Sequence, residues 1–141
     1  MPHPASQTFR LQYDTSTDTF WLWMRPPQAD QPAKRVAQAD FSSIVQEFEI
    51  DGTGYLLIVS DDAMIPYESS IYAVLYSHEA HIIDRLAFPA PYAAMPDIGR
   101  MEWQSKRHLA ITLQDNSVIH IRLWSFASFH KLVGFRRRGK V

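Results

Sequence analysis

Apolar and polar residues alternate along much of this sequence, and this period of two constrains the fold more than any other feature. Side chains of an extended strand point to opposite faces in turn, so alternation gathers the apolar ones on one face. Residues 9–13, 20–24, 71–76 and 109–113 follow the pattern, and turn-forming residues such as 14–18 separate the runs. We therefore expect antiparallel strands joined as hairpins.

Two short segments interrupt the strand pattern. Apolar residues recur at helical spacing between Phe41 and Glu49, where a strand competes because residues 44–50 also alternate. Ser125 can cap a second short helix that continues to Val133. The expected fold is mainly antiparallel β in the α+β class, with roughly seven or eight strands in hairpins and one or two short helices. An all-β sandwich or barrel is the alternative.

Length and proline content indicate the domain organisation. The 141 residues, 46% hydrophobic and 21% charged, suit a single globular domain over residues 1–141. Three prolines predict a surface loop over residues 25–35, because proline interrupts both helices and central strands. Residues 135–141, with the sequence FRRRGKV, predict a basic C-terminal tail.

The last hairpin is the one whose register the sequence constrains best. Apolar residues alternate at positions 109, 111 and 113 and again at 119, 121 and 123. Only a loop of odd length brings both sets to one face. A three-residue loop at 115–117 would pair Leu113 with Ile119, and a five-residue loop has the same parity. A further strand around Met101 and Trp103 is expected before this hairpin.

The polar face of this hairpin is the first candidate site. Alternation places His108, His120, Arg122 and Trp124 together on the side opposite the apolar residues. Such a face could bind an anion or another ligand by charge and aromatic stacking. Half-exposed polar faces are also ordinary in antiparallel sheets, and we weigh that explanation as the more frequent one.

Charge is distributed unevenly along the chain. Residues 36–84 carry nine acidic side chains and no lysine or arginine, whereas residues 85–141 carry ten basic and three acidic ones. Residues 1–35 carry four basic and three acidic side chains, so the segments sum as +1 −9 +7 = −1. A segregated charge steers association with a partner of opposite sign, even where the net charge is small. The basic segment could equally neutralise the acidic one inside the fold.

Motifs that would indicate catalysis are weak. The chain has no cysteine, which excludes disulfides and thiolate chemistry. His78-Glu79-Ala80-His81 lacks the spacing of a helical zinc motif and falls at a predicted turn, so no metal is expected there. No serine lies in a nucleophile-elbow context, and no glycine-rich loop is followed by the lysine of a phosphate-binding motif. We expect neither an enzyme nor a cofactor. A small enzyme using His78, His81 or His120 is the least favoured alternative.

The function favoured by the charge pattern is stoichiometric protein binding. An acidic face would steer a basic protein partner, and buried aromatic rings would hold it. A cytoplasmic immunity or inhibitor protein that neutralises a basic toxin fits this description by analogy of size, charge and missing motifs. Cytoplasmic location is expected because residues 1–7 lack the pattern of a secretion signal. The residues predicted to bind the partner are Glu47, Glu49, Asp51, Asp61, Asp62, Glu68, Tyr67 and Tyr72.

The alternative function is nucleic-acid binding through the basic C-terminal segment. Lysine and arginine side chains bind phosphates with release of counterions. A basic terminal run is also common as a solvated tail, so the pattern alone does not decide. The residues predicted for this function are Arg122, Lys131, Arg136, Arg137 and Arg138.

Overall fold

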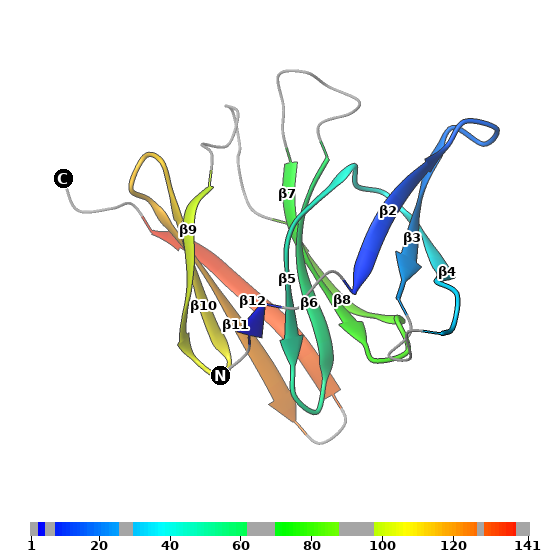
Figure 1. Cartoon of the computed structure of the whole chain (residues 1–141). Coiled ribbons are helices and arrows are strands. Elements are labelled where there is room, and N and C mark those ends of the chain that lie inside the picture. The colour runs from blue at the N-terminus through cyan, green and yellow to red at the C-terminus, as the bar shows by residue number, and fades with distance from the viewer. Residues whose placement is uncertain are drawn as a thin grey trace.

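Three antiparallel sheets are stacked as layers in the computed structural model of the chain (Figure 1). The structure describes residues 3–4, 8–25, 30–61, 70–87, 98–126 and 129–137. The prediction of mainly antiparallel β structure is confirmed. The strands exceed the expected number, and the described part of the chain contains no helix, so the all-β alternative describes the fold better than the α+β class. The described part of the chain therefore contains no helix that is long and apolar enough to cross a membrane.

The central layer is a five-stranded sheet in the order β1-β5-β6-β7-β8. Its strands are β1 (His3–Pro4), β5 (Ser43–Ile50), β6 (Gly54–Asp61), β7 (Ser70–Ser77) and β8 (Ile82–Ala87). The reversal between β7 and β8 falls at His78–Ala80 as predicted, and Ala80 adopts a φ of 65° there. A glycine is required at the start of β6, because a Cβ on Gly54 would lie 2.0 Å from the carbonyl oxygen of Tyr76.

A second sheet of four strands covers one face of the central layer. Its order is β12-β11-β10-β9, with β9 (Ile98–Ser105), β10 (His108–Leu113), β11 (Val118–Phe126) and β12 (Phe129–Arg137). A third sheet covers the opposite face in the order β2-β3-β4, with β2 (Phe9–Asp14), β3 (Thr19–Met24) and β4 (Lys34–Ala39). The predicted first hairpin is confirmed, with Tyr13 opposite Phe20. The predicted loop at 25–35 ends earlier than expected, since Lys34 already belongs to β4.

Burial of β6 on both faces explains the layered arrangement. Its apolar side chains point alternately into two hydrophobic cores, and each of these side chains is almost completely buried. Leu56 and Ile58 belong to the core under the four-stranded sheet, whereas Leu57 and Val59 belong to the core under the three-stranded sheet. A strand that is covered on both faces has no polar side to alternate with, so its sequence is continuously apolar.

The predicted helix over Phe41–Glu49 is wrong, because this segment forms β5. The β5–β6 ladder shifts register between Ile44 and Gln46, so that Val45 is an extra, exposed residue. A bulge of this kind reverses the alternation of faces along the strand. It places Ile44 and Phe48 in different cores although their spacing fits one face of a helix.

The second predicted helix, from Ser125 to Val133, is also wrong. The chain continues as β11 to Phe126 and returns as β12, with Phe126 opposite Phe129. Pairing along the whole of β11 outweighs the local helical spacing, since the ladder of β12 runs from Phe129 to Arg137. The residues that suggested an apolar helix face are exposed instead of buried.

The loop of the last hairpin has the predicted parity but a different position. Thr112 lies opposite Val118 and Ile111 opposite Ile119, which leaves a three-residue loop at 114–116 in place of 115–117. Asn116 takes the left-handed conformation, with a φ of 66°, and its N–H donates to the carbonyl of Leu113 at 3.0 Å. Because the displacement of the register is even, every side chain remains on the predicted face.

The corner where β8 meets β12 joins the central and four-stranded sheets. The Leu132 N–H donates to Oδ2 of Asp84 at 2.8 Å. The side chain of Leu86 approaches Gly134 so closely that a Cβ there would lie 2.5 Å from it. Glycine at position 134 therefore permits the contact between the two edge strands.

Candidate ligand-binding face

The outer face of the four-stranded sheet gathers aromatic and cationic side chains. Inward residues of β11, such as Ile121, are buried in the core, so alternate residues point outward. Cross-strand pairs on the outer side are His120 with Phe135, Arg122 with Val133, and Trp124 with Lys131. His108 of β10 lies opposite Arg122. The four residues predicted to share a face therefore do so.

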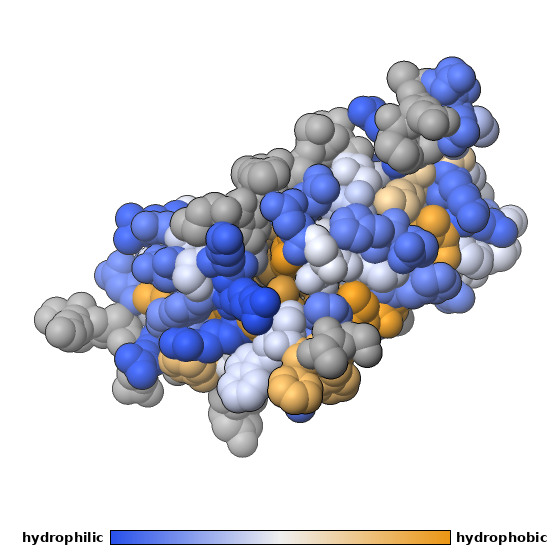
Figure 2. All heavy atoms as spheres, turned by 90° about the horizontal axis from the view of Figure 1, so that it is seen from below, coloured by the Kyte–Doolittle hydropathy of each residue, from blue (hydrophilic) through white to orange (hydrophobic). Residues whose placement is uncertain are grey.

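Large aromatic side chains on this face are exposed to solvent. The exposed fraction is 64% for Trp124, 82% for Phe126 and 64% for Phe129, which lie towards the β11–β12 turn. Phe135 is partly exposed further along β12. In the view from below, hydrophobic surface lies beside strongly hydrophilic surface (Figure 2). Clustered exposed apolar rings, unlike single ones, mark surfaces that bind a partner or ligand.

Cationic side chains surround these rings. Arg122, Lys131 and Arg137 are exposed, and Arg100 of β9 lies opposite Thr112 on the same side. The Arg137 guanidinium lies 5.2 Å from the centre of the Phe135 ring. Within the described ranges, the one salt bridge joins Asp40 and Arg85, so these cations have no carboxylate bound to them there. The face has a net positive charge, with Glu102 as an acidic neighbour opposite Ala110.

Two histidines form a coupled pair at the centre of the face. His108 Nε2 lies 2.7 Å from His120 Nδ1, and the His120 ring stacks on Phe135 with centroids 4.9 Å apart. Burial lowers the pKa of His108, with a further contribution from Arg122. Burial also lowers the pKa of His120, followed by the charge of His108. The short contact between the rings fits a hydrogen bond in which one ring donates and the other accepts, and the arginines and lysine supply positive charge to the face.

A polar pocket lies at one end of the sheet, between the β5–β6 and β9–β10 turns. It has a volume of about 260 Å³, and its polar lining includes Thr53, Lys106, Arg107 and Ser125. Asp51 lines it as well, so its charge is less positive than that of the outer face. The pocket could accept a small hydrogen-bonding group at the end of a ligand that lies along the sheet.

The residues predicted for nucleic-acid binding fall largely on this outer face. Arg122, Lys131 and Arg137 point outward from β11 and β12. Arg136 lies in β12 opposite Ile119, but its side chain is outside the described residues, as is Arg138. Sequence reasoning missed the exposed rings of Phe126, Phe129 and Phe135 as parts of the site. The expected helix obscured Phe126 and Phe129, and the expected C-terminal tail obscured Phe135, although positions 129 and 135 match the alternation expected in one strand.

The residues predicted for acidic docking are dispersed by the fold. Glu47 is only 6% exposed, and its Oε1 accepts the Phe9 N–H at 3.3 Å. Burial raises its pKa, opposed in part by the hydrogen bond from Phe9. The other oxygen, Oε2, has no hydrogen-bond partner among the described residues. Glu47 therefore contributes little charge to the surface.

The remaining predicted acids lie in separate places. Asp51 is in the turn before β6, whereas Asp61 ends that strand, roughly 25 Å away at the rise of an extended chain. Glu49 is half-buried on β5. Tyr72 is covered by the Arg85 guanidinium, 4.3 Å from its ring centre. Three further predicted residues lie outside the described residues: Asp62, Tyr67 and Glu68.

The histidines considered for metal binding or catalysis are not assembled into one site. His78 and His81 are exposed at the β7–β8 turn, whereas His120 is on the four-stranded sheet. Over the ranges that the structure describes, no three His, Asp or Glu side chains are grouped so as to hold a metal ion.

Comparisons with known proteins identify no relative. No protein-family model matches the chain, and neither the curated proteins nor the solved structures contain a significant match.

Proposed function

We propose that this protein is a binding module that holds single-stranded nucleic acid on the outer face of its four-stranded sheet. The observation that carries the proposal is the cross-strand alternation of exposed rings with cations, such as Trp124 opposite Lys131. This is the alternative function that the basic segment suggested. The geometry favours it because the aromatic and basic residues are adjacent, whereas the predicted acidic set is dispersed.

Single-stranded nucleic acid matches both components of the face. An unpaired base can stack on an aromatic ring with a contribution of about 1–3 kcal/mol, irrespective of sequence. The phosphates can then bind Arg122, Lys131 and Arg137, which have no carboxylate partner among the described residues. Neighbouring rings on one strand face are about 7 Å apart, so a flexible single strand can follow them. A duplex would hide its bases from these rings.

The test is direct binding of a labelled oligonucleotide of mixed sequence, measured by fluorescence anisotropy at low salt. Trp124→Ala removes the exposed indole and should weaken binding by roughly 5- to 150-fold, the equivalent of one stacked base. Trp23→Ala, on the opposite side of the molecule, is the matched control and should bind like the wild type. Absence of binding, or an equal loss in both variants, would contradict the proposal.

Docking of a basic protein, as an immunity or inhibitor protein would do, is the second candidate. It is favoured by one observation: Glu49, Asp51 and Asp61 have no ion-pair partner within the described residues. The most useful variant is Glu49→Lys combined with Asp51→Lys, which reverses charge at the β5–β6 hairpin. A protein captured from native lysate by the wild type and not by this variant would support the acidic surface. Equal capture by both would reject it.

A further inference from the structure

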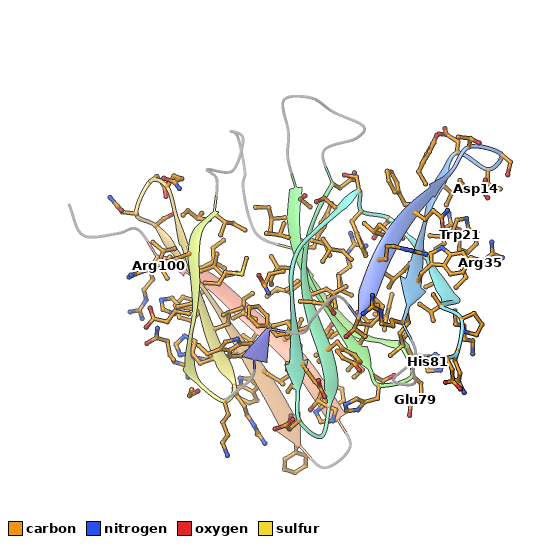
Figure 3. The ribbon with its side chains drawn as sticks, in the orientation of Figure 1. Asp14, Trp21, Arg35, Glu79, His81 and Arg100 are labelled. Atoms are coloured by element: carbon orange, nitrogen blue, oxygen red, sulfur yellow. The ribbon has the colours of Figure 1, made fainter. Side chains whose placement is uncertain are left out.

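A hollow on the outer face of the three-stranded sheet has no role in the function proposed above. It has a volume of about 230 Å³, and its lining includes Gln12, Asp14, Trp21, Trp23 and Arg35. Figure 3 shows Asp14, Trp21 and Arg35 on the same side of this sheet, away from the central layer. The hollow is smaller than the roughly 300 Å³ typical of the smallest drug-sized sites, so it suits a single ring.

The backbone register explains why two indoles lie in this hollow. Leu22 is fully buried towards the central sheet, so its neighbours Trp21 and Trp23 point outward from β3. Gln12 of β2 lies opposite Trp21, and Arg35 of β4 lies opposite Trp23. The Arg35 guanidinium lies over the Trp21 ring at 4.1 Å from its centre. Stacking in this way holds the planar guanidinium in place while its edge can still donate hydrogen bonds.

The polar groups of the hollow are suited to hydroxyl groups. The Asp14 carboxylate accepts hydrogen bonds, the Arg35 guanidinium donates them, and the Gln12 amide does both. Oδ1 of Asp14 accepts the backbone N–H of Ser16 at 3.0 Å, which fixes the orientation of the carboxylate. The Nε1 of Trp21 is buried with no hydrogen-bond partner among the described residues.

Charge balance distinguishes between the classes of ligand. Asp14 and Arg35 compensate each other, so the hollow offers no net charge to a polyanion, and the carboxylate would repel a phosphate. The Arg35 guanidinium covers one face of the Trp21 ring, so Trp23 is the indole of the hollow on which a ligand ring can lie. A sugar ring has an apolar face that can lie on an indole and a rim of hydroxyl groups that both donate and accept. We propose that this hollow binds one neutral sugar ring of an oligosaccharide.

The test follows the four indole N–H resonances of ¹⁵N-labelled protein by NMR, each assigned through a Trp→Phe variant. Neutral oligosaccharides of glucose, xylose, mannose, galactose or N-acetylglucosamine are titrated to about 10 mM, the range of weak binding. At least one should shift the Trp21 and Trp23 resonances saturably and leave those of Trp103 and Trp124 unchanged. No shift with any of these sugars would overturn the proposal, as would shifts of Trp21 and Trp23 with nucleosides alone.

Two variants then separate the hollow from the surrounding sheet. Arg35→Ala should weaken the sugar titration by roughly fivefold or more, as expected for loss of a net hydrogen bond. Lys34→Ala removes the same charge from β4, at a position opposite Met24 and outside the lining of the hollow, and should leave the titration unchanged. Equal loss in both variants would show that sugar does not occupy the hollow. Oligonucleotide binding is measured in parallel and is expected to be unaffected by either change.

Discussion

The four-stranded and three-stranded sheets are attached to opposite faces of the same central sheet, yet their outer surfaces differ in charge and in the arrangement of aromatic rings. On the four-stranded sheet, Trp124 and Phe126 stand exposed among arginine and lysine side chains. On the three-stranded sheet, Trp21 and Trp23 lie in a hollow with one carboxylate and one guanidinium. Similar rings on similar backbones can therefore suit different ligands, because the neighbouring charges would favour an anion on the four-stranded sheet and a neutral molecule on the three-stranded sheet.

The inner sides of the two outer sheets also differ. The core under the four-stranded sheet consists mainly of aliphatic residues, with Phe48 packed edge-on against Trp103 at 5.3 Å. The core under the three-stranded sheet includes Tyr76, whose pKa is raised to about 12 by burial, and the adjacent Glu47 carboxylate bonds to Phe9. A buried carboxylate without a cation lowers stability, so the three-stranded sheet should be the more easily detached layer.

The largest expected effect comes from truncating adjacent residues of β6. Leu57 and Ile58 are both fully buried but face different cores. Leu57→Ala and Ile58→Ala should each lower the free energy of unfolding by about 2–5 kcal/mol. Hydrogen exchange should show lost protection first in the three-stranded sheet for Leu57→Ala and first in the four-stranded sheet for Ile58→Ala. Identical exchange patterns would mean that the layers do not respond separately.

Salt concentration should affect ligand affinity differently on the two outer faces. If three cations, Arg122, Lys131 and Arg137, bind phosphates, the slope of log K against log salt should be about −2 for a single strand. Oligonucleotide affinity should then fall roughly 20-fold between about 50 and 200 mM salt, and Arg122→Gln should make the slope shallower by about 0.7. Sugar affinity of the hollow should change little. A salt-independent oligonucleotide affinity would disprove the electrostatic part of the first proposal.

A smaller effect is expected from Glu47→Gln, beneath the three-stranded sheet. The pKa of Glu47 is raised in the folded state, so ionisation lowers stability as the pH rises through that value. The amide oxygen can still accept the Phe9 N–H without a buried charge. Urea unfolding at pH 7 should show a gain of about 1 kcal/mol, and the gain should disappear near pH 4. A loss of stability at pH 7 would indicate that the carboxylate is compensated by a favourable contact.

The smallest effect concerns the histidine pair on the four-stranded sheet. The folded-state pKa values of His108 and His120 lie below 6.5, so the unfolded state binds protons more readily. The free energy of unfolding should be greatest above pH 6.5 and should fall as the pH drops through the folded-state pKa values. His120→Gln should reduce this pH dependence of Tm. Oligonucleotide binding should strengthen over the same interval, since protonation adds positive charge; weaker binding at low pH would contradict the proposed face.

Strands could be predicted from the sequence wherever alternation was uninterrupted. The first hairpin and the turn at His78–Ala80 follow from local residues alone, whereas the pairing of Tyr13 with Phe20 does not, because pairing with Trp21 would be equally apolar. The last hairpin shows the limit of this argument. The parity of the loop length decides which face a residue occupies, so the outer position of Trp124 was predictable. The choice between loops at 114–116 and 115–117 was not, because both have three residues and exchanging them shifts the register by an even number of residues.

The errors arise where long-range pairing decides the structure. The bulge at Val45 gives the apolar residues of this segment a spacing that resembles that of a helix. Only pairing with the partner strand β6 shows that Val45 is an extra residue in the ladder. The strand around Phe129 is likewise determined by its pairing with β11. Acidic residues close in sequence were expected to form one surface. Glu47 instead points into the interior and Asp51 lies at a turn, because successive residues of a strand have different environments.

The hydrogen bond from Leu132 to Asp84 bears on whether strand β12 can pair with a strand of another molecule. Strand β12 is at the edge of its sheet, and its outward N–H groups are a template on which a strand from another molecule could assemble. Asp84 already occupies one of these donors, and an approaching backbone would meet a carboxylate that repels carbonyl oxygens. A side chain from the acidic segment thus satisfies a backbone donor of the edge strand. We expect Asp84→Ala to leave this donor available to a strand of another molecule.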